Sequence, residues 1–445
     1  MNSASGNPKV KWGAAIVRWL FVGLCVVAVG GLLCSTLGRG SGPALRLLYS
    51  IPVPGEYVAV LEDVSRQGVA ILNATGGDYL TRTEPSPDFQ HPKLLLWNVP
   101  EQKMLREIPL DDCVKRRAQV PERLRTWRLG PFRFVQDGAK VMGLQTPWLF
   151  LVDALTGREV SRYLLSPGLL KGVSPYAGIA LEPLEAAPNG DLVAAVANQG
   201  SIANQGAVRR LVVLRADLQG VIADAPLEYY VADRGLAWSP DGGRIAVLYD
   251  LFLDEKGHDV DWWGKDSLFR TQRDVEVFDA RSGRSLLRFK TGAWEDGISF
   301  SRDGEALWCV SANRSDLSGW SKDVIRIFSS SDGRLMRTVE AGGWGLRGNF
   351  VISPSGRLVV ADASKIVPYF LKEPNMGQKI GRFVLLDAQT GEALFRYHRR
   401  TAGYYIWPSH FAFTSDERYL LVDPNNFHGG PDPRLEEHVD VYMVR

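Results

Sequence analysis

Cysteine is scarce in this chain, which has four cysteines among 445 residues. Cys25 and Cys34 fall within an uncharged run near the N-terminus, so only Cys113 and Cys309 remain in the rest of the chain. An exported protein held together by disulfides normally contains more cysteine than this. Neither remaining cysteine has a second cysteine or a histidine at a spacing typical of a zinc site. We therefore expect both to be free or buried thiols.

The chain also lacks an excess of charge of either sign and any recognisable catalytic motif. Lysine and arginine total 52 against 50 aspartates and glutamates, a net charge of +2. Nucleic acid is not the expected partner, because phosphate binding needs a dense basic surface. No nucleophile elbow, phosphate-binding loop, dinucleotide-binding fingerprint or zinc pattern occurs in the sequence. These absences predict a protein that is not an enzyme and carries no cofactor.

A four-part repeat runs through most of the sequence. Each copy has a hydrophobic run, a tight turn, two further hydrophobic runs separated by a variable connection, then a Ser/Thr-Gly turn and a fourth run. Clear copies occupy 235–292, 297–342 and 349–398, and weaker ones occupy 57–110, 131–165 and 186–230. Four short strands every forty to fifty residues are typical of a propeller blade. The sequence therefore predicts an all-β propeller of four-stranded antiparallel blades.

The last copy, which begins at His410, contains only three strands before Arg445. The segment 46–53, RLLYSIPV, matches the outer strands of other copies, such as SLLRFKTG and LMRTVEAG, better than any inner strand. We expect this N-terminal strand to complete the last blade. Closing the ring in this way removes exposed strand edges. The prediction is a seven-bladed propeller over residues 45–445.

The repeat resembles the WD40-type propeller repeats over about 45–445. In that family the third strand typically ends in Trp-Asp, and the corresponding pairs here are Phe278-Asp279, Val152-Asp153, Leu386-Asp387, Trp97-Asn98 and Phe328-Ser329. The Gly-His pair that the family places before the first strand is absent. The turns are also similar to those of TolB-like and quinoprotein repeats. The resemblance implies a closed propeller ring.

The N-terminal segment has a different character. Residues 19–37 contain no charge, and Lys9, Lys11 and Arg18 precede them. A helix of this length is about 28 Å long, enough to cross a hydrocarbon core. We predict a cytoplasmic tail over 1–18, a transmembrane signal-anchor over 19–37 and a linker over 38–44; a cleaved signal peptide is the alternative. The positive charge before the span predicts a single-pass membrane protein whose propeller is exported, to the periplasm or the cell exterior.

Almost all of the long connections of the repeat belong to one face of the predicted ring. Within a blade, the a–b and c–d turns lie on one face, and the b–c and d–a connections lie on the other. The turns of the first set are nearly all tight. The long connections of the second set are 73–92, 250–273, 362–381 and 423–437 between strands b and c, and 111–129 and 398–409 between blades. Long loops on a rigid scaffold commonly carry binding sites.

Aromatic residues concentrate in these long connections. They are Trp127, Tyr176, Trp262, Trp263, Trp294, Trp320, Trp344, Tyr369, Tyr404, Tyr405 and Trp407. Tryptophan and tyrosine are common interface anchors because they bury a large area with few rotatable bonds. The alternative is that some of them fill the central channel or pack between loops. We predict a binding face for an unidentified protein, peptide or glycan.

One long connection also offers a weak candidate for a metal site. Six acidic residues lie between 250 and 270, and His258, Asp259 and Asp261 are adjacent among them. Carboxylate and imidazole groups can hold a divalent cation, but neither a calcium-loop spacing nor a His-x-x-x-His pair is present. The other interpretation is a charged surface loop. An enzyme or sensor that uses a small ligand or a metal at the channel mouth is thus the alternative function.

Overall fold

The protein is described by a computed structural model that separates residues 1–44 from a second unit formed by residues 45–445. The described residues are 45–53, 57–76, 92–111, 130–145, 148–164, 179–199, 208–253, 270–292, 295–311, 324–340, 344–365, 378–402, 406–407, 410–423, 426–427 and 438–445. No helix in these ranges is long and apolar enough to cross a membrane. The predicted tail, span and linker over 1–44 lie outside the described residues.

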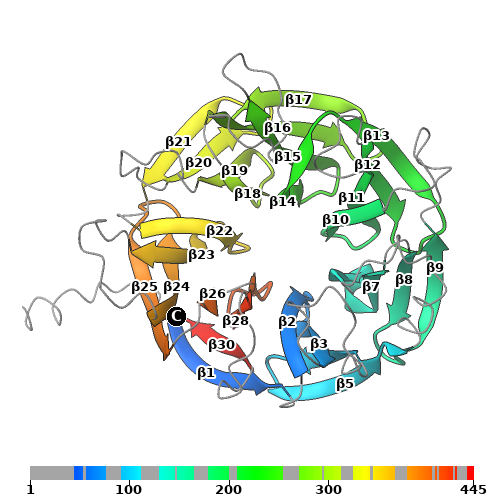
Figure 1. Cartoon of the computed structure of the whole chain (residues 1–445), viewed down its shortest axis with the longest axis vertical. Coiled ribbons are helices and arrows are strands. Elements are labelled where there is room, and N and C mark those ends of the chain that lie inside the picture. Colours follow the sequence, from blue (N-terminus) through cyan, green and yellow to red (C-terminus); the bar gives the residue numbers. More distant parts are fainter. Residues whose placement is uncertain are drawn as a thin grey trace, which may run out of the picture. The chain divides into compact units, whose positions relative to one another are not determined.

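The second unit is a ring of seven four-stranded antiparallel sheets, with the first strand of each sheet nearest the centre (Figure 1). Blade one is β2 (Tyr57–Val64), β3 (Val69–Gly76), β4 (Lys93–Asn98) and β5 (Lys103–Pro109). Blade two is β6 (Phe132–Val135), β7 (Lys140–Gln145), β8 (Trp148–Asp153) and β9 (Glu159–Leu164), with the 3-10 turn η3 (Gln136–Gly138) after β6. Blade three is β10 (Ile179–Ala186), β11 (Leu192–Gln199), β12 (Val208–Arg215) and β13 (Val221–Leu227).

The three strongest sequence repeats form the next three blades. Blade four is β14 (Tyr230–Trp238), β15 (Arg244–Leu253), β16 (Arg270–Asp279) and β17 (Ser285–Lys290). Blade five is β18 (Glu295–Phe300), β19 (Ala306–Ser311), β20 (Val324–Ser329) and β21 (Leu335–Glu340). Blade six is β22 (Trp344–Ile352), β23 (Leu358–Lys365), β24 (Gln378–Asp387) and β25 (Ala393–Ala402). The prediction of an all-β propeller is confirmed.

Blade seven joins strands from the two ends of the ring-forming chain. Its sheet order is β27 (His410–Phe413), β28 (Tyr419–Asp423), β30 (His438–Val444) and β1 (Leu45–Pro52). β1 runs antiparallel to β30, with Leu45 opposite Val444 and Pro52 opposite His438. The closure predicted from the 46–53 segment is therefore confirmed.

The hydrophobic core is divided among the seven junctions between neighbouring blades. Alternate residues of a strand point to opposite faces, so the middle strands of each blade must be apolar on both. In β3, Leu72 packs with blade seven, whereas Ile71 packs with blade two. In β28, Leu421 faces blade one and Leu420 faces blade six. Each fully buried side chain of this size contributes about 1.5–3 kcal/mol.

Two element boundaries differ from the sequence prediction. Blade three begins at Ile179 rather than at residue 186, because a strand that contains Pro183 and a register shift between Leu181 and Leu184 has no clear alternation. The connection predicted over 250–273 is shorter than expected. β15 and β16 continue their pairing out to Leu253 and Arg270, so Asp250 is a strand residue rather than a loop residue.

Candidate binding face and channel wall

The a–b turns on one face of the ring are closed by their own side chains. In blade four, the Ser239 hydroxyl donates to Asp241, which also accepts from the Gly243 N–H at 3.0 Å. The same arrangement recurs in blade five, where Ser301 donates to Asp303 at 2.5 Å. These hydrogen bonds favour the ionised form, and they lower the pKa of Asp241 and of Asp303. The acidic residues of these turns therefore stabilise the turn conformation by accepting hydrogen bonds.

The c–d turns on the same face are closed by an aspartate at the end of the third strand. Asp279, at the end of β16, accepts from the Ser282 N–H at 2.8 Å and from its hydroxyl at 2.7 Å. Asp387 makes the equivalent pair of bonds with Thr390 at 2.7 and 3.0 Å. Gly283 and Gly391 follow with φ of +68° and +75°, a conformation that glycine adopts without strain. This face of the ring, the tight-turn face, is built from short, internally satisfied turns.

The ends of the strands that lead into the long connections lie on the opposite face, which we call the long-connection face. Two of these connections meet there, because β26 (Ile406–Trp407) pairs with β29 (Asn426–Phe427). β26 belongs to the connection between blades six and seven, and β29 belongs to the b–c connection of blade seven. The ladder places Trp407 opposite Asn426. Connections from different parts of the repeat thus come together on this face, as the strand order requires.

Most of the predicted site residues cannot be placed from the described part of the chain. Trp344 is the first residue of β22, at the long-connection end of that strand, and Trp407 lies in β26. The other predicted aromatic residues lie outside the described residues: Trp127, Tyr176, Trp262, Trp263, Trp294, Trp320, Tyr369, Tyr404 and Tyr405. His258, Asp259 and Asp261 also lie outside them. Their proposed roles stay predictions.

The base of the blade-four connection is a stiff extension of the sheet. β15 and β16 pair over ten residues each, which is longer than their outer neighbour β17. Asp250 and Arg273 stand opposite each other and form an ion pair at 2.8 Å, with the Arg273 side chain only 5% exposed. The Thr291 hydroxyl donates to the Arg273 carbonyl at 3.1 Å. The connection over 254–269 therefore leaves from a paired, two-stranded extension of the sheet.

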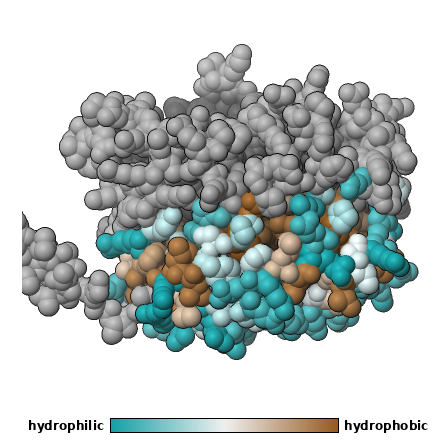
Figure 2. Space-filling view, turned by 90° about the horizontal axis from the view of Figure 1, so that it is seen from below, coloured by the Kyte–Doolittle hydropathy of each residue, from teal (hydrophilic) through white to brown (hydrophobic). Residues whose placement is uncertain are grey.

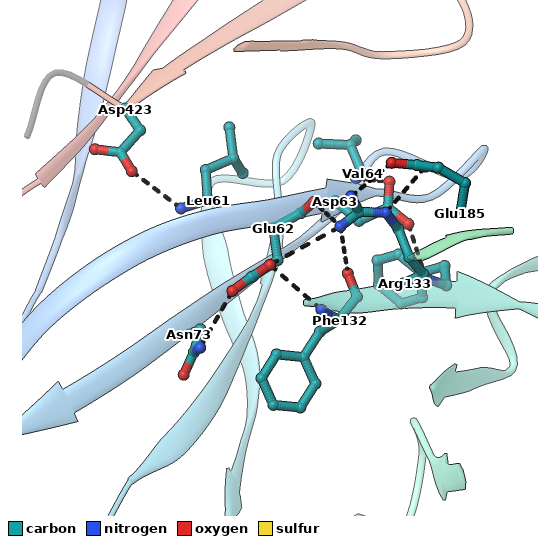
Figure 3. Close-up of polar contacts among 10 residues, drawn as sticks. Leu61, Glu62, Asp63, Val64, Asn73, Phe132, Arg133, Glu185 and Asp423 are labelled. Carbon is teal, nitrogen blue, oxygen red and sulfur yellow. Dashed lines mark hydrogen bonds and ion pairs between the residues drawn. The ribbon is translucent and has the colours of Figure 1, made fainter. Parts of the chain in front are cut away.

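A largely buried charged network among the innermost strands, which we call the channel-wall network, joins three blades (Figure 3). Arg133 of β6 reaches Glu185 of β10 through two hydrogen bonds, of 2.8 and 3.1 Å. The same guanidinium donates to the main-chain carbonyls of Glu62 and Phe132 at 2.9 and 3.0 Å. The Glu62 carboxylate accepts from Asn73 at 3.2 Å and from the Phe132 N–H at 3.3 Å. Inner strands of blades one, two and three are held together by these bonds.

Asp63 is the titrating member of this network. Its carboxylate accepts from the main-chain N–H groups of Phe134 and Val64, both at 2.8 Å. Burial raises the pKa of Asp63 to about 6, against the opposing effect of Arg133 and of the two hydrogen bonds. Asp423 provides a similar tie at the seam between blades seven and one, where it accepts from the Leu61 N–H at 3.2 Å.

The network makes structural sense of residues that the sequence analysis did not single out. Glu62, Asp63, Arg133 and Glu185 all occupy the first, innermost strands of their blades. The signal is a charged residue inside a short apolar strand, as in Phe132-Arg133-Phe134. Because the guanidinium is engaged on every side by carboxylates and carbonyls, we assign the network to blade positioning rather than to ligand binding.

Neither a metal site nor a reactive cysteine is found in the described ranges. No group of three or more potential metal ligands occurs among those residues. Cys309 is a free, fully buried thiol, as expected, and burial raises its pKa well above the usual value. A thiol in that state is a poor nucleophile. Cys113 lies outside the described residues.

Comparison with known proteins supports the architecture at the level of the fold. No protein-family model matches the chain, and no curated protein sequence matches it. A chain in the crystal structure of a mitotic checkpoint complex is similar, with 12% identity, a TM-score of 0.51, and coverage of 91% of this chain and 94% of that one. The fold is a WD40-like seven-bladed β-propeller.

Two further propellers are similar at lower scores. A chain of hydrazine synthase from Kuenenia stuttgartiensis has 14% identity and a TM-score of 0.49 and covers 89% of this chain and 97% of its own length. The β-propeller domain of Cps50 (Swd1) from Myceliophteria thermophila has 10% identity and a TM-score of 0.46, with coverage of 90% and 100%. In the present chain, Asp279 and Asp387 stand where WD40 repeats have the Asp of the Trp-Asp pair. Both carboxylates accept hydrogen bonds that close the c–d turn.

Proposed function

We propose that this protein is a membrane-tethered, non-catalytic scaffold. Its propeller binds a protein, a peptide or a glycan through the long-connection face, on the exported side of the membrane. The tether is the uncharged segment 19–37, and the basic residues before it set the orientation. Binding relies on a rigid ring that presents Trp and Tyr side chains for shape-complementary contact.

The observation that carries this proposal is the division of the ring into two unequal faces. On the tight-turn face, the described turns are short, and their Asp, Ser and Thr side chains hydrogen-bond to their own backbone. The longer connections all leave from the opposite strand ends, and two of them pair through β26 and β29. Rigid scaffolds with long loops gathered on one face use that face for recognition.

The charged groups of the innermost strands have a structural role. The channel-wall network of Arg133, Glu185, Glu62 and Asp63 is occupied by internal hydrogen bonds. The shifted pKa of Asp63 has a structural cause, which is its burial between inner strands. Fold likeness does not decide the matter, because the same ring hosts enzymes and binding modules.

A paired-variant capture experiment tests the proposal. The full chain is solubilised from membranes with its partners crosslinked in place, and captured proteins and glycans are identified. In the test variant, Trp262, Trp263, Trp344 and Trp407 are changed to Ala. The matched control changes exposed turn residues of the opposite face, Arg281, Arg334 and Arg357, to Ala. Both variants must keep the thermal unfolding midpoint of the original protein.

We expect a saturable partner that is retained by the control and lost by the tryptophan variant. If the two variants capture the same molecules, the long-connection face is not the binding surface and the proposal is wrong. Affinity for the purified partner should fall at least tenfold in the tryptophan variant, because interface aromatics are frequent hot spots worth about 2 kcal/mol or more.

The second candidate is an enzyme or sensor with a small ligand or a divalent metal at the channel mouth. It is favoured by one observation, the rigid β15–β16 extension that carries the acidic connection containing His258 and Asp259. Thermal stabilisation by a divalent cation that is lost in His258→Ala would support this candidate. The scaffold proposal predicts no such stabilisation.

A further inference from the structure

Large hydrophobic side chains are exposed at the start of outer strands, close to the tight-turn face. Nine such side chains are exposed among the described residues, and four of them lie in blades three to five, namely Ile222 in β13, Leu286 in β17, and Leu335 and Met336 in β21. The other five lie in three consecutive blades that begin with the strand nearest residues 38–44: Leu47 in β1, Met104 and Leu105 in β5, Leu155 in the turn before β9, and Val160 in β9. Their exposed fractions are 50%, 45%, 45%, 78% and 51%. We call the segments 45–52, 99–109 and 154–164 the outer-strand sector. Single exposed apolar residues are ordinary, but a contiguous group marks an interaction surface.

The sector is continuous because each outer strand packs against the c–d turn of the next blade. The Tyr49 hydroxyl of β1 donates to the carbonyl of Val99, in the turn before β5, at 2.7 Å. Arg106 of β5 donates to the carbonyl of Thr156, in the turn before β9, at 3.3 Å. Figure 2 views the ring from the side of β1 and β5 and shows hydrophobic side chains among hydrophilic ones on this surface.

The charge of the sector complements an anionic surface. Its three segments contain five basic residues, Arg46, Lys103, Arg106, Arg158 and Arg162, against three acidic ones. The acidic residues Glu101 and Glu159 pair with Lys103 and Arg162 of the sector, and Glu107 pairs with Lys93 outside it, so the three segments carry a net charge of +2. Apolar side chains with arginine and lysine beside them are the composition of a surface that rests at a membrane interface.

We propose that the outer-strand sector rests on a lipid bilayer. Leu47, Met104 and Leu155 then enter the boundary between head groups and acyl chains, and Arg46 and Arg106 bind lipid phosphates. This inference rests on the tether of the proposed function. Seven residues, 38–44, separate the uncharged run from Leu45, and they reach at most about 25 Å. A sector that begins so close to the span is held at high effective concentration near the bilayer.

The geometry suits shallow insertion. The exposed apolar residues of β5 and β9 lie within the first three residues of their strands, about 10 Å or less from the strand ends at a rise of about 3.3 Å per residue. Interfacial elements bury their apolar faces by about 5–10 Å. The ring therefore leans on one sector of its rim, and the long-connection face stays open to solvent for a partner.

Lipid quenching at two matched positions tests this inference. The full chain is reconstituted into vesicles of phosphatidylcholine with one-quarter phosphatidylglycerol, and an environment-sensitive dye is attached at Met104→Cys or at Leu335→Cys. Leu335 is the control because it occupies the equivalent place in blade five and has a similar exposed fraction, 48%. Cys25, Cys34 and Cys113 are replaced by Ser, and buried Cys309 is kept. Spin-labelled lipids then quench the dye.

We expect at least threefold stronger quenching by shallow spin labels at Met104→Cys than at Leu335→Cys. A second variant, Leu105→Glu, should reduce the quenching of a dye placed at Val160→Cys. If the protein floats with the vesicles but quenching is equal at the two matched positions, or absent at both, the inference is wrong and the tether is not affected. A protein that does not float with vesicles overturns the tether and this inference together. Self-association through the sector, seen by mass photometry, would also contradict it.

Discussion

Arg133 is the residue whose loss should loosen the ring most clearly. Its side chain is 18% exposed and lies between Glu185, which is 34% exposed, and Glu62, which is 6% exposed. Arg133→Met keeps most of the aliphatic volume but removes the guanidinium. The carboxylates of Glu62, Asp63 and Glu185 then share a low-dielectric site without a cation. Removing one partner of a buried ion pair typically costs about 3–5 kcal/mol.

We expect Arg133→Met to lower the free energy of unfolding by about 3 kcal/mol, the lower part of that range, because Glu185 is partly solvated. Urea denaturation followed by tryptophan fluorescence measures the change. The matched control is Arg215→Met, which breaks an exposed ion pair with Asp217 and should leave the urea midpoint unchanged.

A double variant separates the ion pair from packing. Adding Glu185→Gln to Arg133→Met removes one uncompensated carboxylate, so part of the lost stability should return. A cost below about 1 kcal/mol for Arg133→Met, or no coupling with Glu185→Gln, would refute the view that this network positions the blades. Urea denaturation measures all of these variants without a ligand.

Three further predictions follow from individual sites. Because the pKa of Asp63 is raised to about 6 in the folded state, the wild type should gain up to about 1.4 kcal/mol of unfolding free energy per pH unit, relative to Asp63→Asn, as pH falls from 6 towards 4; parallel slopes in urea titrations would contradict this. Gly391→Ala should lower the thermal midpoint by several degrees, because its φ is +75° and a Cβ would lie 2.1 Å from the Glu340 carbonyl oxygen, whereas Gly220→Ala meets no atom within 4 Å and should be tolerated. Cys309 should resist maleimide labelling until urea unfolds the ring, and labelling of the native protein at that site would show that the blade-five core opens.

The repeat made the ring predictable, because turn chemistry and strand alternation are both local. Asp241 and Gly242, for example, lie between two apolar runs and form a turn there. The last blade was predictable as well, since β1 has the composition of an outer strand. Blade three was placed less well, because the bulged strand that contains Pro183 has no clean period of two.

The channel-wall network could not be predicted in the same way. Glu62, Arg133 and Glu185 are 71 and 52 residues apart in sequence, and their contact depends on inner strands of three blades meeting. A register shift in β2 between Leu61 and Asp63 sets Glu62 on the side of the strand that reaches blade two. The local sequence around each residue does not indicate that these three strands meet. The aromatic binding face stays a prediction, because most of its residues lie outside the described ranges.

The pairing of β1 with β30 also has a consequence for the order of events during synthesis. β1 emerges from the ribosome first among the described strands, but its partner begins at His438, almost 400 residues later. At about 5–20 residues per second, β1 waits roughly 20–80 s for that partner. During this time the ladder that β1 forms with β30 in the folded ring has no second strand. The ring therefore cannot close through the β1–β30 ladder before the C-terminal strand has been synthesised.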